Sequence, residues 1–583
     1  MRSFFKMLLA SFVALVLFSI IVFFFLLAVV GRMASSDQPQ VYQQSVLVID
    51  LSQHFAEYEK QQPLALVRGG DARLPALYDV IRLIKYAGDD ERIAGMYILA
   101  NGNSNGFAAS EELRQAIGKF KTTGKFVFAY GDMITQKAYS VASIADRFYV
   151  SPQGFVEWSG YNVTYPFFKG TLDKLEIKPQ IFYAGKFKSA TEPFRTDKMT
   201  PENQLQTAVW LNDLYSSFLM QTAEVRQIDT ATLHRLANEG LIRNAADAVQ
   251  YKLVDGVRYD DEVKDELKAK LKIGKLDKIN FLPITDYYAT NPIRQKGEKI
   301  AMIVAEGDII DGKSDPGTIG SDTYRSLIRK ARLDASIKAI VLRVNSGGGS
   351  ALASETIWRE LSLARAEKPV IVSFGDVAAS GGYYIACGAD SIFAQRSTIT
   401  GSIGVFGMLP DMQDFFKNKL GVTFDGVKTA PHADAGAIYR PLTDTEKQML
   451  QQGVERTYAQ FKLRVAEGRK KDTSFVDSIG QGRVWTGMRA QEIGLVDRFG
   501  GIDDAVQCAA RKAKLDQYQV LLYPESPSLL QQLLGKPEPM NFTDKLKAEW
   551  GEENYRLYQE MKRIKEMAAG PQARLPFTLY FNQ

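Results

Sequence analysis

The sequence predicts an α/β protein built from two tandem copies of one βαβ-type domain, preceded by a single membrane-spanning helix. Three observations support this prediction: a long uncharged apolar segment near the start, an internal repeat at a constant offset, and alternating strand-like and helix-like segments within each copy. With 583 residues, of which 45% are hydrophobic and 24% charged, the chain has enough apolar side chains for several folded domains.

The apolar segment runs from Met7 to Val30 and contains no charged residue. A helix of this length measures about 36 Å, which exceeds the ~30 Å hydrocarbon core of a bilayer. A cleaved signal peptide is the alternative, but its apolar region is usually shorter and ends in small residues. We therefore expect an uncleaved anchor that contacts the lipid bilayer through residues 7–30. Arg2 and Lys6 precede it, so the N-terminus is expected in the cytoplasm and the remaining chain on the other side.

The repeat places Ile93–Ile117 on Ile337–Leu361 and Tyr130–Asp146 on Phe374–Asp390. Each copy reads as an apolar strand, a turn rich in Gly, Asn or Ser, a helix opened by Ser-Glu, a second apolar strand, a turn and a helix. This order predicts βαβ units and a mainly parallel sheet covered by helices. The expected strands are Met96–Ala100, Phe126–Tyr130, Ile340–Val344 and Val370–Phe374.

These patterns divide the chain into five parts. A charged helical connector is expected between the copies, at Asp260–Lys275, and the tail has Leu557, Met561, Ile564 and Ala568 at helical spacing. The expected parts are the cytoplasmic tail and anchor (1–36), the first repeat (46–260), the connector (261–297), the second repeat (298–506) and a C-terminal helical tail (507–583).

Composition excludes several classes of function. The formal net charge of +5 is small for this length, and no basic block is interleaved with aromatic residues, which argues against a nucleic-acid partner. The two cysteines, Cys387 and Cys508, are expected to be buried free thiols, since two cysteines cannot form a disulfide framework. The three histidines are scattered and no phosphate-binding loop is present, so we expect no metal and no nucleotide cofactor.

Residues that occur in both copies are expected to have structural roles as caps, turns and packing, because such roles do not depend on one copy alone. These pairs are Asp132 and Asp376, Tyr139 and Tyr383, Asp146 and Asp390, and the Ser-Glu pairs at 110–111 and 354–355.

Positions at which the two copies differ are candidates for catalytic residues. Ser380 is matched by Gln136 in the first copy, and the glycines that follow Ser380 are absent there. A serine on a strand-to-helix turn, followed by glycines that let a substrate approach, is typical of a nucleophile. The amides of Gly349 and Gly381 could then bind an oxyanion. A serine N-cap beside two ordinary glycine-rich turns is the alternative.

A nucleophilic serine needs a base, and histidine is scarce. The first copy has Lys186 and Lys188 at the place where the second has His432. Burial disfavours the ammonium form, so a buried lysine can be neutral and accept a proton. A solvated surface lysine is the alternative.

Four motifs in order, "GKFKSATEPF", "VNSGGGSALASE", "GDVAASGGYYIACGAD" and "TGSIGVFG", resemble the signal peptide peptidase A (protease IV) family in its long, duplicated form. The resemblance spans residues 46–506 and implies a fold of the Clp protease/crotonase superfamily. It implies Ser380 as nucleophile, Lys188 as general base, the amides of Gly349 and Gly381 as oxyanion hole, and Ser402 as the residue that orients the lysine. The chain has Gly347 where the family usually has proline, which leaves φ of the oxyanion turn free.

The function that the resemblance implies is that of a membrane-anchored serine endopeptidase with a Ser-Lys dyad, which degrades remnant signal peptides and other extended hydrophobic peptides. It also implies a homotetramer in the bacterial cytoplasmic membrane, with catalytic domains that face the periplasm. A catalytically weak membrane-anchored scaffold that binds hydrophobic peptide segments is the main alternative. Acyl-CoA chemistry on a crotonase-type fold is a second alternative.

Overall fold

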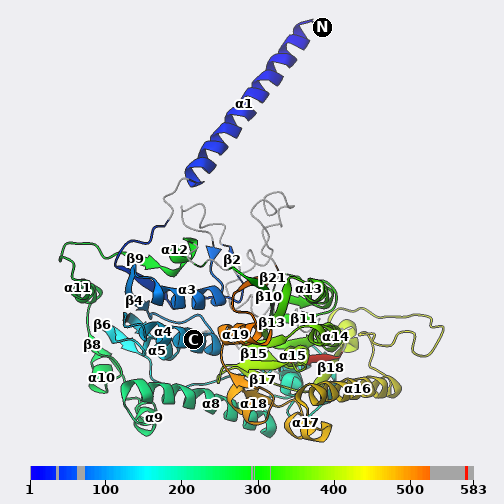
Figure 1. Ribbon diagram of the computed structural model, residues 1–583. Coiled ribbons are helices and arrows are strands. Elements are labelled where there is room, and N and C mark those ends of the chain that lie inside the picture. Colours follow the sequence, from blue (N-terminus) through cyan, green and yellow to red (C-terminus); the bar gives the residue numbers. More distant parts are fainter. Residues whose placement is uncertain are drawn as a thin grey trace.

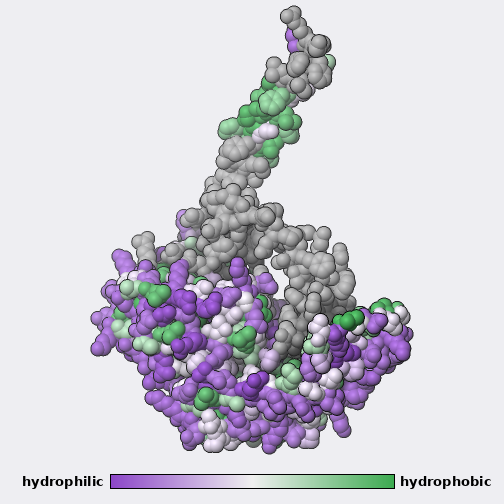
Figure 2. Space-filling model, turned by 90° about the vertical axis from the view of Figure 1, so that its right-hand side faces the viewer, coloured by the Kyte–Doolittle hydropathy of each residue, from purple (hydrophilic) through white to green (hydrophobic). Residues whose placement is uncertain are grey.

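The computed structural model shows a long helix, α1 (Arg2–Ala34), that projects from a folded body (Figure 1). Apolar surface is concentrated along this helix, whereas the body is mainly hydrophilic (Figure 2). Taken over the residues whose placement is described, no helix is long and apolar enough to cross a membrane, so the anchor stays a prediction. The structure describes residues 2–34, 39–58, 60–61, 73–290, 293, 296–315, 317–524 and 571–575.

The first repeat folds around a parallel sheet with the strand order β8-β6-β5-β4-β1-β9. Both predicted strands are present in it, as β4 and β5, each longer by a few residues than the sequence indicated. The strands are β1 (Ser45–Asp50), β4 (Ile93–Leu99), β5 (Phe126–Ile134), β6 (Arg147–Val156), β8 (Gly256–Val257) and β9 (Phe281–Pro283).

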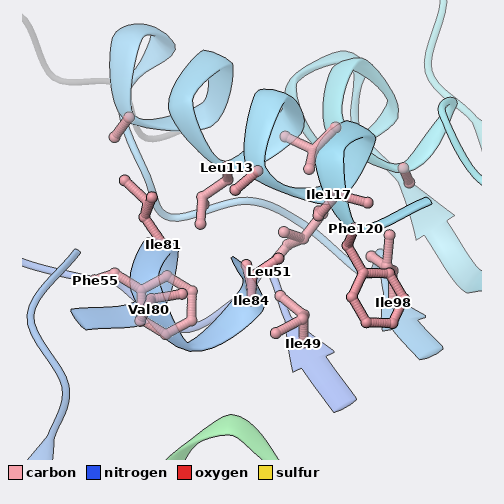
Figure 3. Close-up of a cluster of buried hydrophobic side chains, with 14 of the residues drawn as sticks. Ile49, Leu51, Phe55, Val80, Ile81, Ile84, Ile98, Leu113, Ile117 and Phe120 are labelled. Atoms are coloured by element: carbon pink, nitrogen blue, oxygen red, sulfur yellow. The ribbon is translucent and has the colours of Figure 1, made fainter. Parts of the chain in front are cut away.

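Two helices, α3 (Leu77–Asp89) and α4 (Phe107–Lys121), bury their apolar faces near this sheet. Figure 3 shows Ile84 of α3 and Ile117 of α4 near Ile49 of β1, all fully buried. The same hydrophobic cluster continues into the strands of the second repeat, so the two repeats share one core. Removing apolar side chains from water in this way is the main driving force that holds the repeats together.

The second repeat repeats the plan with the strand order β19-β17-β15-β13-β10-β21, and only the pairing of β19 is antiparallel. A side branch joins β16 to β15 and β20 to β16. Both predicted strands are present, as β13 and β15. The strands are β10 (Glu298–Glu306), β13 (Ile337–Ser346), β15 (Val370–Ala379), β16 (Ser391–Ala394), β17 (Ile399–Gly401), β19 (Val484–Thr486), β20 (Arg498–Phe499) and β21 (Tyr518–Tyr523).

A third sheet combines strands from both repeats and from the C-terminal tail, in the order β12-β11-β14-β22-β18-β7. The antiparallel pairing of β7 with β18 connects the first repeat to the second, from Ala184 opposite Val405 to Lys178 opposite Asp411. The strands are β7 (Lys178–Ala184), β11 (Asp308–Ile310), β12 (Thr318–Gly320), β14 (Gly348–Ser350), β18 (Val405–Asp411) and β22 (Gln572–Arg574).

The helices that the Ser-Glu pairs were expected to open begin three residues earlier. In the second repeat, α14 (Ala351–Glu367) is capped by Ser350, whose hydroxyl accepts a hydrogen bond from the Ala353 amide. In the first repeat, α4 is capped from the other repeat, because the Asp376 carboxylate accepts from the amides of Ala108 and Ala109 at 2.8 and 3.1 Å. A cap supplied by a distant segment cannot be read from the local sequence.

Two boundaries between the expected parts also differ. The connector region contributes β9 to the first sheet and the tail contributes β21 to the second, and each pairs with the first strand of its repeat. The described part of the tail after α19 contains the strands β21 and β22, while the residues at helical spacing, 557–568, lie outside the described part of the chain. The connector helix is confirmed as α11 (Asp260–Leu271).

A buried ionic cluster fixes the junction of the repeats. Arg343 of β13 is fully buried and donates to Glu57 at 2.9 and 3.0 Å and to Glu112 of α4 at 2.7 Å.

Both cysteines are buried and free, as expected. The other elements are β2 (Lys60–Gln61), β3 (Arg73–Leu74), α5 (Gln136–Ala142), α6 (Lys169–Lys174), α7 (Glu192–Arg195), α8 (Pro201–Arg226), α9 (Thr230–Asn238), α10 (Ala245–Gln250), α12 (Ile284–Ala289), α13 (Ser321–Leu333), α15 (Gly381–Ala386), α16 (Asp444–Arg469), α17 (Thr473–Ile479), α18 (Gly487–Glu492) and α19 (Ile502–Lys512).

Candidate active site

Ser380 lies at the sharp turn between β15 and α15 and is fully buried. Its backbone has φ 54° and ψ −115°, a conformation that costs a non-glycine residue about 1–3 kcal/mol. Two backbone hydrogen bonds hold it there: the Ser380 amide donates to the Gly401 carbonyl at 2.8 Å, and the Tyr384 amide donates to the Ser380 carbonyl at 2.8 Å. The serine is thus held in a strained turn at the end of a central strand, a geometry that is typical of a nucleophile elbow.

Lys188 reaches this serine from the other repeat. Its Nζ lies 2.8 Å from Ser380 Oγ, 3.0 Å from Ser402 Oγ and 3.2 Å from the Ser402 carbonyl oxygen. The side chain is only 1% exposed, and burial lowers its pKa well below the usual value of 10.5 because the ammonium loses its hydration. A neutral amine has a lone pair, so the contact with Ser380 can be one in which the hydroxyl donates to nitrogen.

The segment that carries Lys188 is clamped by the second repeat. The Phe187 amide donates to the Gln481 carbonyl at 2.8 Å. Gly482 has φ +78°, and a Cβ there would lie 2.6 Å from the backbone nitrogen of Lys188. From the first repeat, the Gln206 amide group donates to the Phe187 carbonyl at 3.1 Å. These contacts fix the backbone of Lys188 against the second repeat. The side chains of Lys188 and Ser380 are therefore held in contact by ordered backbone on both sides.

The two glycine-rich turns predicted to form an oxyanion hole lie against each other. A Cβ on Gly348, which has φ +99°, would lie 2.6 Å from the Gly381 backbone nitrogen. A Cβ on Gly349 would overlap the Ile309 carbonyl oxygen, so only glycine fits this approach of β14 to β11. Gly347 needs no left-handed conformation, and a Cβ there would make ordinary contacts with Leu575 at 3.5 Å or more.

The structure therefore brings together all five residues that the sequence singled out. Ser380, Lys188 and Ser402 are joined by hydrogen bonds, Gly381 directly follows the serine, and Gly349 belongs to the adjoining turn. Their catalytic roles stay predictions, since contacts alone do not measure catalysis. In the part of the chain that is described, no group of three or more His, Cys, Asp or Glu side chains is placed to hold a metal ion.

Residue pairs shared by the two repeats make equivalent structural contacts. The hydroxyls of Tyr139 and Tyr383 donate to the carbonyls of Leu253 and Leu495 at 2.7 and 2.9 Å. The Asp146 and Asp390 carboxylates likewise accept from the amides of the strand residues Val127 and Val370. The predicted fold roles of these two pairs are confirmed.

The sequence did not predict that the C-terminal tail would reach this site. Residues 572–574 form β22, which pairs with the glycine turn of β14. The available signal was a pair of prolines, Pro571 and Pro576, because a residue before proline favours extended backbone.

Comparison with known proteins identifies the family of the chain. The model of peptidase family S49 matches residues 119–274 and 362–516, one match in each repeat and more than half of the chain together. The chain belongs to peptidase family S49. Protease 4 of Salmonella typhi is 39% identical over 79% of this chain and 75% of its own length, and Protease 4 of Haemophilus influenzae is 38% identical over 74% and 72%.

A third relative, "Serine protease SPPA, chloroplastic" of Arabidopsis thaliana, is 32% identical over 73% of this chain and 64% of its own length. The family match and these relatives make the chain a serine-type peptidase of family S49, with a mixed α/β fold and two S49 repeats. The resemblance to the signal peptide peptidase A (protease IV) family is confirmed.

Proposed function

We propose that this S49 peptidase cleaves peptide bonds with a dyad of Ser380 and Lys188, one residue from each repeat. The observation that supports this proposal most directly is the 2.8 Å contact between Lys188 Nζ and Ser380 Oγ in a fully buried setting. Burial keeps the lysine neutral at lower pH than a solvated lysine, because its pKa is lowered. The second contact of Nζ, with Ser402, orients the amine toward the serine.

In the proposed reaction, Ser380 Oγ attacks the carbonyl carbon of the substrate while Lys188 accepts the hydroxyl proton. The amides of Gly349 and Gly381 bind the oxyanion, an interaction worth about 3–4 kcal/mol per donor in other hydrolases. Lys188 then delivers the proton to the leaving amine, and the acyl-enzyme remains. Water, deprotonated by the same lysine, hydrolyses the ester and regenerates Ser380.

We infer further that the substrates are remnant signal peptides and other extended hydrophobic peptides. The resemblance to the family supports this, as does the uncharged segment 7–30, which would anchor the site beside a bilayer. A periplasmic orientation in the bacterial cytoplasmic membrane, a homotetramer and a Clp protease/crotonase type of fold belong to the same proposal. Membrane fractionation of the full chain, and its mass in detergent by light scattering, test the anchor and the oligomer.

Turnover by a Ser380→Ala variant tests the dyad. Wild-type protein should cleave unfolded casein and a synthetic signal peptide, whereas Ser380→Ala should leave both intact although it unfolds at the same temperature. A signal peptide whose apolar core is replaced by Ser and Gln should be cut much more slowly. Equal cleavage by Ser380→Ala would refute the dyad, and no cleavage by wild type would favour a peptide-binding scaffold.

A further inference from the structure

The tail strand β22 occupies a position between two strands that border the site. On one side it pairs antiparallel with β14, with Gly348 opposite Arg574 and Gly349 opposite Ala573. On the other side Gln572 pairs with Phe406 of β18. Figure 1 shows this short strand, in red, beside β18 and near α15. Many proteins bind an extended peptide by pairing its backbone with a strand that has a free edge.

The register directs one carbonyl of β22 toward the predicted oxyanion hole. The Leu575 amide donates to the Gly347 carbonyl at 2.7 Å, and the Ala351 amide donates to the Pro571 carbonyl at 3.2 Å. Hydrogen-bonded pairs alternate along an antiparallel ladder, so Gly349 and Ala573 form the hydrogen-bonded pair between these two contacts. The amide of Gly349 therefore faces the Ala573 carbonyl.

The second predicted donor lies beside the same carbonyl. A Cβ built on Gly381 would be 3.0 Å from the Ala573 carbonyl oxygen, and one built on Gly348 would overlap that oxygen. The same Cβ built on Gly348 would also lie 2.6 Å from the Gly381 nitrogen. Ala573 thus has its carbonyl where the scissile carbonyl of a substrate is expected, next to the fully buried Ser380.

Two residues further along, Leu575 packs into an apolar cluster to which both repeats contribute. The leucine is 6% exposed and belongs to one cluster with Trp210 and Leu214 of α8, from the first repeat. The second repeat adds three residues to this cluster, Ala379, Ile399 and Val484, of which Ala379 directly precedes the nucleophile. Burial among such residues favours an apolar side chain over a charged one at this position.

We propose that Pro571–Leu575 blocks the active site in cis as a substrate-like strand, with Leu575 in the pocket that receives an apolar substrate residue two positions beyond the scissile bond. This inference rests on the proposed function, since it assigns β22 to the substrate position of the Ser380 site. The backbone contacts to β14 and β18 hold the strand, the ion pair between Arg574 and Asp308 at 3.3 Å adds to them, and Leu575 anchors its end. A substrate must displace this strand before it reaches Ser380.

Binding tests the proposal without any turnover. The probe is a fluorescein-labelled peptide with the sequence of residues 569–577, AGPQARLPF, added to full chains that carry Ser380→Ala. The chain with Leu575→Asp in addition should bind the peptide at least about tenfold more tightly than the chain with the native tail. A peptide with Asp in place of leucine should bind about tenfold more weakly or worse. Equal affinity of both peptides would overturn the pocket assignment.

Kinetics give the matching test on the active enzyme. Full-length Leu575→Asp should cleave a short quenched peptide with a KM several-fold or more below that of wild type, at similar kcat, because its own strand competes less. Leu276→Asp, at a leucine that is 98% exposed, serves as the control and should leave KM unchanged. Thermal unfolding shows whether each variant is folded. An unchanged KM in a folded Leu575→Asp enzyme would overturn the block. Absence of activity in both the wild type and folded Leu575→Asp would refute the proposed reaction and leave the binding result standing.

Discussion

Replacing Lys188 by methionine tests the proposed base with little change in side-chain volume. The variant keeps a chain of similar length in the buried site but removes the nitrogen that lies 2.8 Å from Ser380 Oγ. General bases contribute about 10²- to 10⁴-fold to rate, which corresponds to about 2.7–5.5 kcal/mol of transition-state stabilisation. We expect kcat to fall by this factor, and residual activity to come from the oxyanion hole and substrate binding.

The pH profile gives this prediction a second readout. Lysine accepts a proton only when neutral, so kcat/KM of the wild type should rise with pH through the pKa of Lys188, which burial lowers well below 10.5. Lys188→Met should lose this rise. The free energy of unfolding should also rise with pH. In the unfolded chain Lys188 keeps its proton up to about pH 10.5, whereas in the folded chain it loses the proton at a lower pH. Wild-type stability should therefore increase with pH between the lowered pKa and 10.5. Below that interval the wild type bears the full cost of burying a charged lysine, so Lys188→Met should be more stable than the wild type there.

Lys186→Met is the matched control, because Lys186 is exposed and lies two residues away. It should keep the wild-type kcat and pH profile in the same peptide assay. A Lys188→Met enzyme within about tenfold of wild-type kcat that kept the pH-dependent rise would refute the role of Lys188 as base.

Three other variants test the support of the site. Arg343→Met should lower the free energy of unfolding in urea by about 3–5 kcal/mol, because it leaves two buried carboxylates without a cation; a loss below 1 kcal/mol would contradict this. Gly482→Ala places a Cβ 2.6 Å from the Lys188 backbone and should lower kcat by about 10²-fold. Gly170→Ala is the control, because a Cβ there meets no neighbour within 4 Å, and it should leave kcat unchanged. Ser402→Ala removes one partner of the amine and should lower kcat by about 2- to 10-fold with little change in KM, a result that steady-state kinetics can check.

Comparison of the two repeats distinguishes the candidate nucleophile Ser380 from residues with structural roles. Ser380 was recognised because the first copy has Gln136 at its place, and the shared pairs such as Tyr139 and Tyr383 proved to make equivalent contacts. The main strands followed from continuous apolar runs, because buried parallel strands are apolar on both faces. Lys188 was selected over Lys186 only through the family motif, since burial cannot be read from a lysine in isolation.

The short strands could not be predicted from the sequence, because their length and the origin of their conformation leave no local signal. β9, β14 and β22 are each three residues long, too short for a period of two to stand out from turns and loops. Their conformation is set by the neighbouring strands with which they pair rather than by their own residues. The cap that Asp376 gives to α4 is of the same kind, because it joins residues 268 positions apart in the chain.

The division of the dyad between repeats has a consequence for the newly made chain. Lys188 and Ser380 are 192 residues apart, so at synthesis rates of about 5–20 residues per second the serine emerges roughly 10–40 s after the lysine. In the proposed mechanism the first half has a base but no nucleophile during that interval, so it is not expected to hydrolyse the nascent chain or its neighbours. In the proposed mechanism the two residues meet only after the first repeat has docked on the second, for instance through the pairing of β7 with β18, so peptide cleavage is expected only from the completely folded chain.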